Sequence, residues 1–125
     1  MKYGFKELIV FQKAYKLSME IYSLSKAFPR EETYSLTDQI RRASRSICVN
    51  IGEGYGKRVY PKHFVSKMTD ADGERHETLV WLDYSKDCKY IDEVKYSELV
   101  IGYEEVGKLL WYYISHPEKF GPRSK

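Results

Sequence analysis

A chain of 125 residues, of which 42% are hydrophobic and 31% charged, can form one packed core but is too short to stabilise two. The formal net charge of +3 neither requires nor excludes a nucleic-acid partner, because the field depends on where the charges lie. The apolar runs are too short to span a membrane, and no apolar segment of a secretory signal follows the N-terminus. We therefore expect a cytoplasmic protein whose Cys48 and Cys88 are reduced and largely buried.

The first helix is predicted from residue 5 to about residue 27. Its apolar residues recur at alternating steps of four and three, which places them on one face: Val10, Ala14, Leu17, Ile21, Leu24 and Phe28. Pro29 ends this helix, because the residue before a proline is disfavoured in the helical conformation. A polar connection follows, in which Ser35 and Asp38 resemble a cap for the next helix.

The second helix is predicted from residue 36 to residue 56. Its core positions are Leu36, Ile40, Ala43, Ile47 and Ile51. Arg41 and Arg45 lie one turn apart and away from that face, so they are available to a partner. A separate polar strip of this helix, together with a glutamate of the next helix, is predicted to form a structural polar network: Arg42, Ser46, Asn50, Glu53 and Glu77.

Gly52, Gly54 and Gly56 each weaken a helix by about 1 kcal/mol relative to alanine, so three within five residues need a reason. One interpretation is a loop that holds a phosphate. Such a loop places its glycines after a strand and before a helix, whereas these follow a helix and no strand precedes them. The sequence therefore favours helix termination and close helix packing.

Two further helices are predicted, from residue 61 to about residue 89 and from residue 93 to just before Pro117. Pro61 suits the first turn of a helix, and Asp92 is a good N-cap. The two apolar seams are Phe64, Met68, Ala71, Leu79 and Leu82, and then Leu99, Tyr103, Val106, Leu110 and Tyr113. Four amphipathic helices with short connections predict an all-α, up-down antiparallel four-helix bundle over residues 1–116, followed by a polar tail over residues 117–125.

Five basic residues are candidates for contact with nucleic-acid phosphates: Arg41, Arg45, Lys57, Arg58 and Lys62. The alternative is that some of them pair with acids of the third helix or of a neighbouring subunit.

The sequence offers little for catalysis or metal binding. Asp72 and His76 are spaced to share one ion, with Glu53 and Glu77 as further ligands, but the Glu-x-x-His motif of di-metal bundles does not occur. Neither cysteine has a histidine at a defined spacing. We expect no metal, no cofactor and no enzyme activity.

Several segments together resemble one known family. They are residues 8–14 (LIVFQKA), 28–37, 39–43, 46–47 and 50–54, with weaker similarity continuing through Gly73, Glu77 and residues 90–91. The pattern resembles that of the bacterial four-helix-bundle proteins associated with intervening sequences of large-subunit (23S) ribosomal RNA genes, often labelled S23 ribosomal protein.

The resemblance implies a left-handed bundle that assembles as a homopentamer and has no enzyme activity. The family is also similar in architecture to the basic pentameric accessory protein of diversity-generating retroelements. These features favour a binding or scaffold module associated with RNA or DNA. The acidic run of residues 70–74 departs from the family pattern and offsets local positive charge. Two alternatives remain: a protein-interaction adaptor that does not bind nucleic acid, and a bundle metalloprotein.

Overall fold

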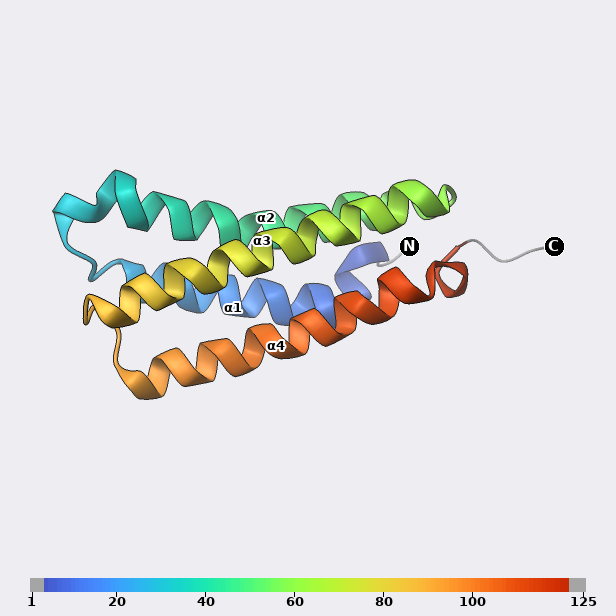
Figure 1. Cartoon of the computed structure of the whole chain (residues 1–125). Helices are drawn as coiled ribbons and strands as arrows, with labels where there is room; N and C mark the ends of the chain where they lie inside the picture. The colour runs from blue at the N-terminus through green and yellow to red at the C-terminus, as the bar shows by residue number, and fades with distance from the viewer. Residues whose placement is uncertain (1–3, 122–125) are drawn as a thin grey trace.

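The computed structural model describes residues 4–121, which form a bundle of four α-helices. They are α1 (Ile9–Ser25), α2 (Asp38–Gly56), α3 (Pro61–Asp87) and α4 (Glu93–Ser115). Successive helices run in opposite directions, so the α1–α2 and α3–α4 connections share one end of the bundle and the α2–α3 turn lies at the other (Figure 1). The predicted all-α four-helix bundle is confirmed. Within residues 4–121, no helix is both long and apolar enough to cross a membrane.

The predicted apolar faces form the core. All five core positions of the second helix are buried, and so are all five of the fourth. On α1 the first four predicted residues are buried, while Leu24 and Phe28 are partly buried against the same cluster. The ring of Phe28 lies 5.5 Å from that of Tyr90, which closes the end of the bundle that carries the α1–α2 connection.

Two helix starts differ from the prediction. The chain forms a 3₁₀ turn over Gly4–Glu7, and α1 begins only at Ile9. Before α2, a π-helical turn over Thr33–Thr37 replaces the expected cap. Ser35 Oγ donates to the Glu32 carboxylate at 2.6 Å instead of capping the helix. The predicted caps of the later helices are present, with Pro61 in the first turn of α3 and Asp92 accepting from the Lys95 amide at 2.7 Å.

Glycines mark the places where helices approach closely. A Cβ added to Gly54 would lie 3.0 Å from Lys67 Cβ, and one added to Gly102 would lie 2.7 Å from Leu17 Cδ2. Gly56 is the last residue of α2. Close packing and helix termination therefore explain Gly54 and Gly56, and the chain has no phosphate loop at this position.

Two sequence expectations need correction near helix ends. Cys48 is buried, and burial raises its thiol pKa to about 11, but Cys88 is exposed because it follows the last residue of α3 at the end of the bundle. Part of the predicted polar tail is also packed. The chain forms a 3₁₀ turn over Pro117–Lys119, which brings the Phe120 ring to 4.3 Å from that of Tyr113. Residues 122–125 of the predicted tail lie outside the described residues.

Candidate nucleic-acid interface

Three cations surround one aromatic ring where α1 and α2 lie side by side. The Arg41 and Arg45 guanidinium carbons lie 4.7 and 5.5 Å from the centroid of the Tyr22 ring, and Lys26 Nζ lies 4.9 Å from it. The i, i+4 spacing on each helix places Tyr22 beside Lys26 and Arg41 beside Arg45. We call these four residues the Tyr22 cluster.

Arg41 is held in place by a second contact. Its Nε donates to Ser25 Oγ at 2.7 Å, and Ser25 in turn donates to the Tyr22 carbonyl at 3.0 Å. Ser25 is 2% exposed, so the hydroxyl that holds Arg41 is shielded from solvent. The Arg41 guanidinium is therefore oriented before any ligand arrives.

The cations of the Tyr22 cluster are not neutralised by ion pairs in the part of the chain that the structure describes. Among residues 4–121, none of Lys26, Arg41 and Arg45 forms an ion pair with a carboxylate. The negative face of the tyrosine ring attracts the cations without neutralising them. The cluster is thus a concentrated positive charge that an anion can approach from solvent.

The remaining basic candidates form a second patch at the far end of α2. Arg58 donates to the Tyr55 carbonyl at 2.9 Å and lies 3.9 Å from the Tyr55 ring centroid, while Lys57 and Lys62 are exposed around the turn into α3. Twelve residues of helix separate Arg45 from Lys57, which is about 18 Å. The structure therefore divides the five predicted contacts between two patches, one where α1 and α2 lie side by side and one at the turn from α2 into α3.

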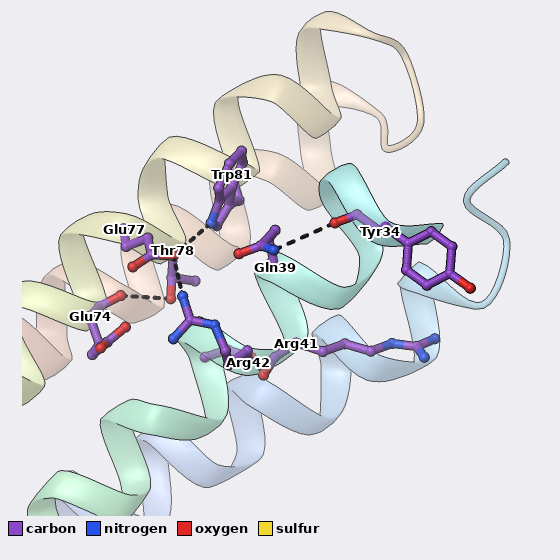
Figure 2. Close-up of polar contacts among 9 residues, drawn as sticks. Tyr34, Gln39, Arg41, Arg42, Glu74, Glu77, Thr78 and Trp81 are labelled. Atoms are coloured by element: carbon purple, nitrogen blue, oxygen red, sulfur yellow. Dashed lines mark hydrogen bonds and ion pairs between the residues drawn. The ribbon is translucent and has the colours of Figure 1, made fainter. Parts of the chain in front are cut away.

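The predicted polar network lies between α2 and α3 and falls into separate pairs. Arg42 Nη2 lies 2.9 Å from Glu77 Oε2, which also accepts from the Trp81 indole nitrogen at 3.1 Å. Figure 2 shows Arg42 directed toward Glu77, whereas the neighbouring Arg41 extends away along the pale blue helix α1. The α2–α3 seam therefore uses Arg42 for a structural contact.

The other members of that network have different partners. Glu53 pairs with Lys67 at 2.8 Å, which lowers the pKa of the Glu53 carboxyl. Asn50 donates to the Ser46 carbonyl at 2.9 Å, so the Ser46 hydroxyl takes no part in that bond. The structure does not join these residues to the Arg42–Glu77 pair.

An acidic surface lies beside the Arg42–Glu77 pair. Burial, followed by the charges of Glu77 and Asp70, raises the pKa of the Glu74 carboxyl, and its Oε1 is buried without a hydrogen-bond partner. This surface repels phosphates, so the positive charge of the bundle is not continuous around it.

Asp72 and His76, whose spacing suits one metal ion, make other contacts in the structure. Asp72 Oδ1 accepts from Arg75 Nε at 2.7 Å, and His76 Nδ1 lies 2.8 Å from the Asp72 carbonyl oxygen. No group of three or more potential metal ligands occurs within the described residues.

Tyr22 and Lys26 were missed as site residues by sequence reasoning. The apolar pattern of α1 assigned Tyr22 to the edge of the core, and Lys26 is the C-cap residue of α1, at a helix end where lysines are common. The signal that could have found them is the pairing of an aromatic residue and a cation at i, i+4 on one helix with two arginines at i, i+4 on the next.

Residues 6–112 match the family model described as 23S rRNA-intervening sequence protein. The chain is also similar to a solved structure from Bacteroides thetaiotaomicron, described as a protein with unknown function from the S23 ribosomal protein family. The two chains share 28% sequence identity with a TM-score of 0.77, over 86% of this chain and 96% of the other. No curated protein matches the chain. The family match extends from the first turn into α4 and includes both basic patches.

Proposed function

The chain belongs to the 23S rRNA-intervening sequence protein family, and we propose that it is a non-enzymatic, cytoplasmic binding module that assembles with copies of itself and contacts the phosphates of RNA or DNA. The observation that carries the proposal is the Tyr22 cluster. Its three cations lie within 5.5 Å of the centroid of one aromatic ring and have no ion pair within residues 4–121.

The chemistry of the cluster suits a phosphodiester. A guanidinium donates two parallel hydrogen bonds to phosphate oxygens, and an orientation fixed before binding lowers the entropy that binding costs. Arg41 meets this condition through its bond to Ser25. Such contacts fix the position of a nucleic acid without reading its bases. We therefore propose binding that depends on charge and shape.

Self-assembly multiplies the effect of a small patch. A net charge of +3 attracts nucleic acid weakly in one copy, whereas several copies present several clusters to one ligand. The homopentamer that the family resemblance implies is part of this proposal.

A protein-interaction adaptor is the second candidate function. It is favoured by the acidic surface around Glu74, where Asp70 and Glu77 add charge that repels nucleic acid. Under this alternative the basic residues bind an acidic protein surface.

The decisive experiment is salt-titrated binding to structured RNA and to duplex DNA, with two adjacent arginines compared. Arg41→Gln removes a cation without an ion pair among the described residues, whereas Arg42→Gln removes the same charge from a residue paired with Glu77. Loss of one phosphate contact reduces the magnitude of the negative slope of log K against log salt by about 0.9 on duplex DNA. We expect this change for Arg41→Gln and a clearly smaller one for Arg42→Gln.

Two results contradict the proposal. One is no binding to either nucleic acid at low salt; the other is an equal loss in the two variants, because charge alone would then explain it. Circular dichroism of both variants verifies that the bundle is intact.

A further inference from the structure

An apolar groove runs along the surface between α1 and α2. It has a volume of about 630 Å³, and its apolar walls include Phe5, Phe11, Tyr15, Met19 and Val49. The Phe5 and Phe11 rings meet edge to face at 5.0 Å, and Tyr15 stacks on Phe11 at 5.9 Å. Tyr15, Met19 and Val49 are about half exposed, at 54%, 46% and 55%. A contiguous apolar surface of this kind is typical of a binding surface.

A row of exposed apolar side chains lies on the outer face of α4, and the exposed charges of Glu98, Glu105 and Lys108 lie between them. Val94, Ile101 and Tyr112 are 69%, 57% and 42% exposed, and steps of seven and eleven residues align them on one side of the helix. Trp111, at 67% exposed, lies on the adjacent side of the helix. The row extends over eighteen residues from Val94 to Tyr112, about 27 Å along the helix. No described part of the same chain covers it.

The two surfaces differ in charge. α1 and α2 together carry five basic and three acidic side chains, a net charge of +2. Within residues 4–121, the side chains on this side without an ion pair are the cations Lys16, Lys26, Arg41 and Arg45 and the carboxylates Glu20 and Asp38. α4 carries two basic and four acidic side chains, a net charge of −2, and those without an ion pair in the same range are Glu93, Glu104 and Lys108. Glu104 lies one turn from Ile101, and Lys16 lies one turn from Met19. The groove on the more basic side is therefore complementary in charge to the more acidic α4.

We propose that the α1–α2 groove binds the outer face of α4 from a second copy of this chain. This inference rests on the self-assembly part of the proposed function and names the surfaces that carry it. The groove and the α4 row are different surfaces of one bundle, so the contact is heterologous: each copy offers its groove to one neighbour and its α4 row to another. Repetition of such a contact gives a closed ring or an open filament.

Three exposed β-branched residues provide a matched test. Val49 lies in the groove, Ile101 lies in the α4 row, and Val80 lies on α3 outside both surfaces, with exposures of 55%, 57% and 50%. Lysine at each position adds the same charge to a helix surface. We expect Val49→Lys and Ile101→Lys to reduce the mass in solution to that of a monomer, and Val80→Lys to retain the wild-type mass. Circular dichroism and thermal unfolding verify that each variant is folded.

Mixing the two monomeric variants tests which surface meets which. The Ile101→Lys copy keeps an intact groove and the Val49→Lys copy keeps an intact α4 row, so the mixture can form one contact and no more. We expect native mass spectrometry to detect a heterodimer in the mixture, twice the monomer mass, over a range of concentrations in which each variant alone stays monomeric.

The possible failures have different meanings. A mixture that stays monomeric overturns the pairing of groove with α4, and so does a Val49→Lys or Ile101→Lys variant that keeps the wild-type mass. If Val80→Lys also becomes monomeric, the assignment to these two surfaces is wrong although self-assembly stands. A wild-type chain that is itself monomeric at micromolar concentration overturns the proposed self-assembly and this inference together.

Discussion

A glycine-to-alanine pair on two helices tests the close approach of α1 and α4. At Gly73, on α3, an added Cβ meets no atom within 4 Å. At Gly102 it meets Leu17 Cδ2, Cδ1 and Cγ at 2.7, 3.1 and 3.4 Å. Because three atoms of one isobutyl group are crowded together, rotation of a methyl does not relieve the contact. Leu17 is 8% exposed, so the whole side chain must move against the core.

The expected magnitudes follow from two opposing effects. Alanine in place of glycine stabilises a helix interior by about 1 kcal/mol, and at Gly73 nothing opposes this gain. At Gly102 overpacking of the core costs about 1–3 kcal/mol. We therefore expect Gly73→Ala to raise the free energy of unfolding by about 1 kcal/mol. The free energy of unfolding of Gly102→Ala should be about 1–3 kcal/mol lower than that of Gly73→Ala.

Urea denaturation followed by far-ultraviolet circular dichroism measures both values, at one fixed protein concentration because assembly contributes to stability. An unchanged m-value is required for the comparison. If the two alanine variants have equal unfolding free energies, Leu17 is not confined by α4 and the packing argument is wrong.

Three further predictions concern single side chains. Lys89 has a φ of 66°, which is costly for a non-glycine residue, so Lys89→Gly is expected to raise the free energy of unfolding by about 0.5–1 kcal/mol in urea denaturation; a decrease would contradict the assigned strain. The Tyr96 hydroxyl donates to Asp83, which raises its pKa to about 12, so the folded pKa lies above the ordinary value of 10. The resulting stabilisation is complete below pH 10 and is lost as the pH rises to about 12; stability measured over this range should fall less steeply in Tyr96→Phe than in the wild type, and parallel curves would refute the assignment. The Tyr103 hydroxyl is buried without a partner, so Tyr103→Phe should unfold at the same urea concentration as the wild type or a higher one, and a loss above about 1 kcal/mol would reveal a hydrogen bond to that hydroxyl.

The fold was predictable because the apolar residues of each helix recur at steps of three and four, which identifies the face that packs in the core. The buried positions of α4, from Leu99 to Tyr113, follow that spacing without exception. Helix starts were less predictable, because the Ser35 hydroxyl can form a hydrogen bond with either the α2 backbone or the Glu32 carboxylate, and in the structure it bonds to Glu32. Such competition depends on distances that spacing alone does not determine.

The candidate site was only partly predictable for a related reason. The divergence of Arg41 from Arg42 follows from the 100° between successive helical residues, and the sequence indicated that the two have different environments. That Arg41 meets Tyr22 depends on how α1 and α2 pack, because sixteen residues or more separate Arg41 from Ser25 and Tyr22. The packing of Phe120 was not predicted either, because its contact with Tyr113 depends on the 3₁₀ turn over Pro117–Lys119.

The separation of the two basic patches along α2 sets a minimum length for a ligand that reaches both. Sixteen residues of helix lie between Arg41 and Lys57, which is about 24 Å. Duplex DNA rises about 3.4 Å per base pair, so about seven base pairs span that distance. A shorter duplex contacts one patch at a time, whereas a longer one engages the second patch at a high effective concentration. Affinity should therefore rise in a step, rather than smoothly, as the length of the duplex passes this threshold.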